Sequence, residues 1–140
     1  ARQRAALACI VFALDLDAAD ARAGRLVAQT TRVSDAVGML TPSELAVLAP
    51  ATAHAGAVQL AERVGTVLRE AIGKGVLPKG STLRVGYEAV ANLTYTPVDP
   101  AELLVRASAA LRSGQPEPGH AWVRRFEAAL PAASRSSRAS

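Results

Sequence analysis

The sequence has only one cysteine and no long apolar run, and each of these features excludes some classes of protein. One cysteine, Cys9, excludes a disulfide framework and a zinc site built from cysteines. Because Cys9 lies within an apolar segment, we expect a buried small side chain rather than a reactive thiol. No apolar run approaches the roughly 20 residues that span a bilayer, so we expect no membrane insertion of this segment. A lone cysteine also fits a reducing, cytoplasmic location, although the chain begins without Met and is interpreted as part of a longer protein, in which a membrane anchor stays open.

Aromatic residues are scarce, at 4% of the chain, and the basic residues are dispersed. The net charge of +4 therefore comes without the basic stripe interleaved with aromatics that is typical of nucleic-acid binding. We expect no nucleic-acid polymer as a partner, whereas a small anionic ligand suits the charge. The sequence has no P-loop, no dinucleotide fingerprint and no nucleophile elbow. His54 and His120 have no Cys or His partner at metal-ligand spacing, so we expect them at surface or cap positions.

The residues that are present form alternating strand and helix patterns. Half of the 140 residues are hydrophobic, enough for one domain with an aliphatic core. Periodicity predicts, in order, strand 5–16, helix 18–31, a hairpin of strands 36–40 and 44–48, helix 53–73, strand 81–90, helix 100–113 and strand 120–126. This order predicts an α/β fold, a mixed sheet of about five strands that includes a β-hairpin and is flanked by helices. The predicted domain spans residues 5–126, and residues 127–140 are predicted to be a flexible C-terminal tail.

Turn and cap residues mark the ends of these elements. The turn at 41–43 joins the two strands of the hairpin. Thr52 is the predicted N-cap of the second helix, and Asp99 is the predicted N-cap of the third. The QPEPG stretch at 115–119 is predicted to be a loop.

Two acidic residues, Asp15 and Asp17, end the first predicted strand. At i,i+2 on a strand they point to the same side, where they would hold a divalent metal through oxygen ligands. The alternative, which we prefer, is that Asp17 caps the following helix and Asp15 is a solvated strand end.

A charged pair, Arg32 and Asp35, precedes the hairpin. One interpretation is a site for a compact anionic ligand, because an arginine fork binds phosphate oxygens in a bidentate way. The other is a surface ion pair worth about 0.3–0.5 kcal/mol. The pair by itself leaves both interpretations open.

Five spaced segments together resemble the GGDEF domain of diguanylate cyclases. Residues 12–17 match the family's first strand with its D-x-D ending, and residues 34–48 match the segment through its signature hairpin. Residues 57–64 match the helix after the hairpin. Residues 83–86 match the V-S-I-G strand, and residues 99–111 match the D-x-x-E-L-L helix. The resemblance covers most of residues 7–126, in the family's order. It implies the same nucleotide-cyclase-like α/β fold.

The resemblance also implies a catalytically inactive domain, because the signature is degenerate. The five signature letters are replaced by Thr41, Pro42, Ser43, Glu44 and Leu45. Active members have two glycines at the first positions, which let the backbone approach the GTP phosphates. Only weak metal candidates, Asp15 and Glu44, remain, so Mg²⁺ and other cofactors are not expected.

The same resemblance implies that a product-binding site survives. Many GGDEF domains carry an R-x-x-D motif five residues before the signature, and it binds cyclic di-GMP. Arg32 and Asp35 stand at that spacing from Thr41, and Arg63 matches a position where the family often has a further ligand arginine. Arg32, Asp35 and Arg63 are therefore predicted to converge on one face as a cyclic di-GMP site.

Three functions are compatible with these features. The first is a cyclic di-GMP receptor that relays occupancy to a flanking domain or partner protein, with a homodimer as a further option. The second is a structural or dimerisation module that binds no nucleotide. The third is a residual GTP-binding protein or cyclase that uses Asp15 and Glu44. We rank them in this order.

Overall fold

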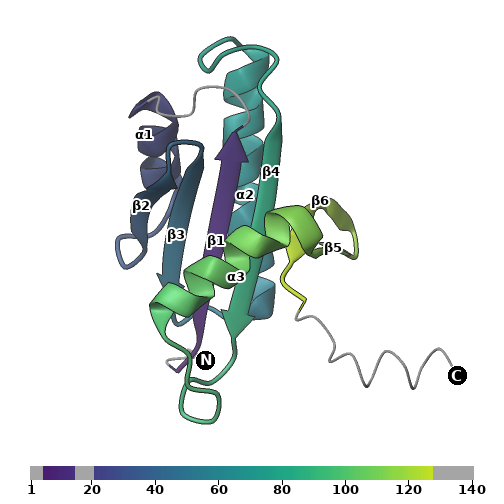
Figure 1. Ribbon diagram of the computed structural model, residues 1–140. Coiled ribbons are helices and arrows are strands. Elements are labelled where there is room, and N and C mark those ends of the chain that lie inside the picture. Colours follow the sequence, from purple (N-terminus) through teal and green to yellow (C-terminus); the bar gives the residue numbers. More distant parts are fainter. Residues whose placement is uncertain (1–4, 15–20, 128–140) are drawn as a thin grey trace, which may run out of the picture.

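The computed structural model describes residues 5–14 and 21–127 (Figure 1). Its elements are, in order, β1 Leu7–Leu14, α1 Ala21–Thr30, β2 Ala36–Thr41, β3 Glu44–Pro50, α2 His54–Gly73, β4 Leu83–Val90, α3 Pro100–Ser113, β5 Gln115–Glu117 and β6 His120–Arg125. The predicted order of strands and helices is confirmed, with ends that differ by a few residues. Asp15, Asp17 and nearly all of the predicted tail at 127–140 lie outside the described residues.

The strands form one open mixed sheet in the order β2-β3-β1-β4-β6-β5. β1 lies in the middle and pairs antiparallel with both β3 and β4, while β4 and β6 pair in parallel. The prediction of a mixed sheet is confirmed, but the sheet has six strands rather than five. The additional strand is β5, which was predicted to be a loop. It has only three residues, Pro116 among them, so it shows no alternating pattern.

β1 is buried on both faces, as its continuous apolar sequence predicts. Ile10 and Phe12 belong to a core shared with α1 and α2, whereas Cys9 and Val11 belong to a core shared with α3. Accordingly, α3 lies across one face of the sheet and α2 lies behind the other (Figure 1). Cys9 is fully buried, which confirms the prediction, and this burial raises the pKa of its thiol to about 12.

The helix ends follow the sequence signals in one case and depart from them in another. Asp99 is the N-cap of α3, and its Oδ1 accepts a hydrogen bond from the Ala101 amide at 2.9 Å. The prediction for Thr52 is wrong. The N-cap of α2 is Ala53, which makes no side-chain cap bond, because the Thr52 hydroxyl has other partners.

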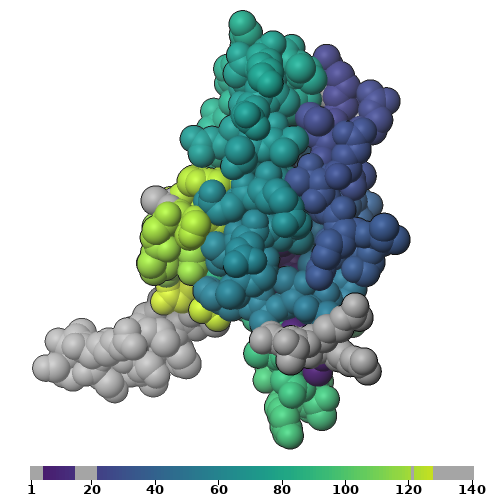
Figure 2. Space-filling model, turned by 180° about the vertical axis from the view of Figure 1, so that it is seen from behind, coloured from purple at the N-terminus to yellow at the C-terminus, as the bar shows by residue number. Residues whose placement is uncertain are grey.

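The β5–β6 hairpin lies along α2, as seen from behind in Figure 2. Two histidine–glutamate pairs connect the hairpin to the helix. In one pair the helix supplies the histidine, and in the other it supplies the glutamate. His54 of α2 lies 3.0 Å from Glu117, and His120 of β6 lies 2.7 Å from Glu62 of α2. Both histidines are partly exposed, as predicted for surface positions, and each also contacts a glutamate across the boundary between the hairpin and the helix.

Trp122 completes this contact. A Cβ atom at residue 65 would overlap the Trp122 ring, so Gly65 allows the indole to pack directly on the α2 backbone. The guanidinium of Arg69 covers the same ring, 5.3 Å from its centroid.

Within the described part of the chain, no helix is long and apolar enough to cross a membrane.

Candidate ligand-binding site

Arg32 and Asp35 form a closed turn between α1 and β2. The Asp35 amide donates to the Arg32 carbonyl at 3.0 Å, and the Arg32 amide donates to Oδ2 of Asp35 at 2.9 Å. The Arg32 guanidinium adds a bond from Nη2 to Oδ1 at 3.1 Å. The Asp35 side chain is 0% exposed, whereas that of Arg32 is 48% exposed. The arginine thus covers the carboxylate and itself remains open to solvent.

The segment between β3 and α2 holds the other side of the Arg32 guanidinium. Nη2 of Arg32 also donates to the Pro50 carbonyl at 3.1 Å and to Oγ1 of Thr52. The Thr52 hydroxyl in turn donates to the same Pro50 carbonyl at 3.0 Å. Thr52 is itself buried, with 6% of its surface exposed. Ala51, between them, has a φ of 54°, in the left-handed region that a residue with a Cβ rarely adopts.

Arg63 reaches the same place from α2. Its Nε donates to the Thr30 carbonyl at the end of α1, at 3.4 Å. Arg32 and Arg63 line one cavity of about 280 Å³ together with Ala51, Thr52, Ala53, Gly56, Gln59 and Leu60. None of these lining residues is acidic. The N-terminus of α2, which has no side-chain cap, contributes the positive end of its dipole at the same cavity.

The cavity therefore combines two guanidinium groups with a helix N-terminus, and it suits an anion. The structure brings two of the three predicted site residues, Arg32 and Arg63, to its wall. The third, Asp35, lies beneath Arg32 and does not line it. Thr52 lines it as well, and the sequence pattern missed this contribution because a threonine before a helix favours an N-cap.

The segment that resembles the signature, residues 41–45, contains the turn between β2 and β3. Thr41 ends β2, and its hydroxyl accepts from the Ser43 amide at 3.3 Å, across Pro42. Glu44 begins β3, and its Oε1 accepts from the Ser108 hydroxyl of α3 at 2.7 Å, while Leu45 is buried in the core. Among the residues that the structure describes, no group of three or more His, Cys, Asp or Glu side chains is placed to hold a metal.

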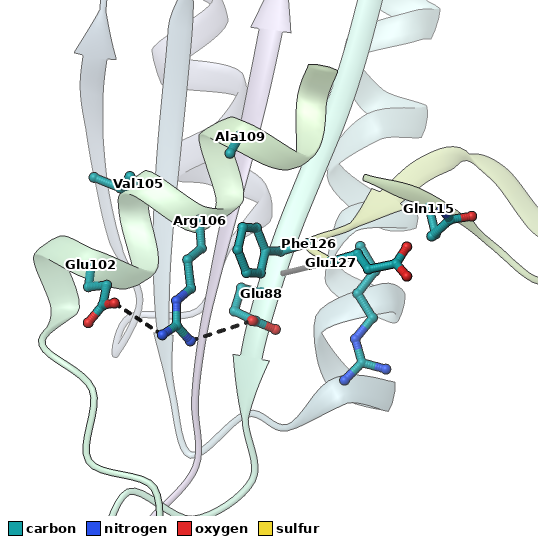
Figure 3. A pocket seen from close by; sticks show the side chains of 9 residues that line it. Glu88, Glu102, Val105, Arg106, Ala109, Gln115, Phe126 and Glu127 are labelled. Carbon is teal, nitrogen blue, oxygen red and sulfur yellow. Dashed lines mark hydrogen bonds and ion pairs between the residues drawn. The ribbon is translucent and has the colours of Figure 1, made fainter. Parts of the chain in front are cut away.

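A larger cavity of about 720 Å³ lies beside α3 (Figure 3). It is lined by Arg106 and Arg125 and by three glutamates, and none of the predicted site residues reaches it. Arg106 is already paired with Glu102 at 3.1 Å and Glu88 at 3.8 Å, and it covers the Phe126 ring at 5.6 Å. Because its acidic groups outnumber its arginines, this cavity is less suited to an anion than the one at Arg32 and Arg63.

A polar network that the sequence did not reveal lies between α2, β4 and β5. The Tyr87 hydroxyl donates to Oε1 of Glu117 at 2.6 Å, and His54 contacts both residues. Burial, and then the hydrogen bond to Glu117, raise the pKa of Tyr87 well above its ordinary value. Burial raises the pKa of Glu117, but hydrogen bonds from Tyr87 and His54 outweigh it and lower that pKa overall. The network is compact and internally satisfied, so it stabilises the hairpin.

The fold and the site define a class: an open mixed sheet with a β-hairpin at one edge, helices on both faces, and a basic cavity near the start of that hairpin. Solved structures of GGDEF domains have this fold. The active GGEEF domain of a diguanylate cyclase from Vibrio cholerae is similar with a TM-score of 0.65 and 16% identity, over 90% of this chain and 86% of that one. The GGDEF domain of PA1120 (YfiN or TpbB) from Pseudomonas aeruginosa gives 0.63 and 19%, over 90% and 85%.

A third similar structure is the GGDEF domain of DgcB from Caulobacter crescentus, which was solved in complex with c-di-GMP. Its TM-score is 0.58 at 14% identity, over 86% of this chain and 77% of that one. The sequence matches no protein-family model and no curated protein. The chain is thus a GGDEF-like domain in its fold.

Proposed function

We propose that this domain is a cyclic di-GMP receptor that does not synthesise the dinucleotide. The observation that carries the proposal is the cavity shared by Arg32 and Arg63, which come from distant parts of the sequence and meet where no acidic side chain lines the wall. A cyclic dinucleotide presents two phosphodiesters, and guanidinium groups form charge-assisted hydrogen bonds with phosphate oxygens. The similar DgcB domain was solved with this ligand. Binding would be relayed to a flanking domain or partner protein.

The hairpin between β2 and β3 lacks the groups that synthesis of the dinucleotide needs. Thr41, Pro42 and Ser43 supply no carboxylate and no glycine for a close backbone approach to phosphates. Glu44 is engaged by Ser108, and a single carboxylate is a poor magnesium site. Incubation of the domain with GTP and Mg²⁺ is expected to yield no cyclic di-GMP. Formation of the product above a no-protein control would instead support a residual cyclase.

Isothermal titration calorimetry tests the receptor directly. Cyclic di-GMP is expected to bind the wild-type chain, and Arg63→Ala is expected to weaken binding by at least about tenfold, as the loss of a charge-assisted bond to phosphate does. Arg112→Ala is the matched control, because it removes the same charge from α3, on the opposite face of the sheet. No heat of binding at tens of micromolar protein, or equal effects of the two variants, would contradict the proposal.

The edge strand β2 favours a second candidate, a dimerisation module. Among the described strands, none pairs with the outer side of β2, and β2 carries no charged residue. Met39 is 53% exposed on it, and Leu40 is also exposed. Uncharged exposed edge strands pair readily with another strand. If this candidate is right, sedimentation shows a dimer without ligand, and Met39→Lys converts it to a monomer.

A further inference from the structure

The position of Asp35 decides whether its carboxylate can recognise the base of a bound nucleotide. Oδ1 and Oδ2 of Asp35 both accept hydrogen bonds from Arg32, and the side chain is completely covered. A carboxylate that reads guanine must accept from the N–H groups on the edge of the base. In this structure Asp35 has no exposed oxygen with which to do so.

Two of the three guanidinium nitrogens of Arg32 are already used in hydrogen bonds within the protein. Nε and Nη2 donate to Asp35, Pro50 and Thr52. Nη1 makes no hydrogen bond to any described residue. Arg32 therefore offers one nitrogen to a ligand, whereas a bidentate contact with a guanine edge uses two donors held side by side.

Arg63 offers more hydrogen-bond donors to a ligand than Arg32 does. Only its Nε is engaged, by the Thr30 carbonyl, and its two terminal nitrogens make no hydrogen bond to the described residues. A terminal fork of this kind matches two oxygens of one phosphate. The remaining polar side chain on the cavity wall is Gln59, whose amide both donates and accepts and can turn to suit either purine.

Resting on the proposed function, we infer that the cavity binds the phosphodiester of a cyclic dinucleotide and does not distinguish its bases. Arg63, with Nη1 of Arg32, contacts the phosphate. Asp35 and Thr52 are positioning residues that act through Arg32. The site thus accepts cyclic dinucleotides as a class, guanine or adenine, by their shared backbone.

The first test needs no variant. Calorimetric titrations of the wild-type chain with cyclic di-GMP and with cyclic di-AMP are expected to give dissociation constants within about threefold of one another, because the Asp35 carboxylate is covered and the Gln59 amide suits either purine. A preference of more than about tenfold for cyclic di-GMP overturns the inference and leaves the receptor proposal standing. Binding of neither dinucleotide overturns both.

The second test is a double-mutant cycle on Thr52. Thr52→Val removes the hydroxyl at nearly constant shape and is expected to weaken both dinucleotides by about fivefold, the effect of one hydrogen bond. Thr52→Ser, which retains the hydroxyl, is expected to bind as the wild type does. In the Arg32→Ala background, Thr52→Val is expected to have no further effect, because Thr52 acts through Arg32. An equal loss in both backgrounds would contradict the positioning role.

Asp35→Asn separates positioning from base recognition. Loss of the carboxylate loosens Arg32, so both dinucleotides are expected to weaken by the same factor. A loss confined to cyclic di-GMP would show that Asp35 contacts guanine, and would overturn the inference.

Discussion

Trp122 packs directly on the backbone of Gly65, so that β6 is held against α2, the helix that carries Arg63. We predict that Gly65→Ala destabilises the domain by about 1–3 kcal/mol, because the added methyl group must displace the indole. Urea unfolding followed by circular dichroism measures the change. Gly73→Ala, at the end of the same helix with no neighbour within 4 Å of the added atom, is the control and is expected to be neutral or slightly stabilising. Equal stabilities of the two variants would contradict the contact.

The network of Tyr87, His54 and Glu117 predicts a dependence of stability on pH. Burial raises the pKa of Glu117, but the hydrogen bonds outweigh it, so the folded pKa lies below the ordinary 4.5. The folded state then binds fewer protons than the unfolded state in acid. The stabilising contribution of Glu117 is therefore complete above pH 4.5 and is lost as pH falls through the folded pKa.

Glu117→Gln removes this titration, so the free energy of unfolding is expected to fall less steeply between about pH 5 and 3 than in the wild type. Glu70→Gln, at an exposed position of α2, serves as the control and is expected to keep the wild-type slope. Identical slopes for wild type and Glu117→Gln would show that the network does not hold the carboxylate ionised.

Ala51 provides a prediction at the wall of the cavity. Its φ of 54° is strained for alanine and unstrained for glycine. Ala51→Gly is therefore expected to stabilise the domain by about 0.5 kcal/mol, the relief of strain less the added entropy of the unfolded chain. The same change at exposed Ala55, in the first turn of α2, is expected to cost up to about 1 kcal/mol. Thermal unfolding of both variants decides, and a destabilised Ala51→Gly would refute the assigned backbone strain.

Much of the fold could be predicted because its elements carry strong local signals. The apolar run of β1, the helical period of α2 and the Asp99 cap each show in consecutive residues. β5 could not be predicted, because three residues with a proline have no period and pair only once β6 is in place.

The candidate site was predictable in part. The spacing of Arg32 and Asp35 before the hairpin, and the place of Arg63 on the next helix, pointed to two residues that do share a cavity. The burial of Asp35 and the role of Thr52 depend on how the segment after β3 folds back on Arg32, which no local pattern encodes. The Tyr87–Glu117 bond likewise joins residues that are 30 positions apart in the sequence, in two strands that are not neighbours in the sheet.

The most direct test of the central claim is a ¹H–¹⁵N NMR titration of the domain with cyclic di-GMP. We predict that the largest shifts occur at the backbone amides of Arg32, Gly56 and Arg63 and at the Arg63 side-chain Nε, since these groups surround the cavity. Shifts centred on the hairpin turn at 41–43 or on the cavity beside α3, or no shifts at saturating ligand, would contradict the account.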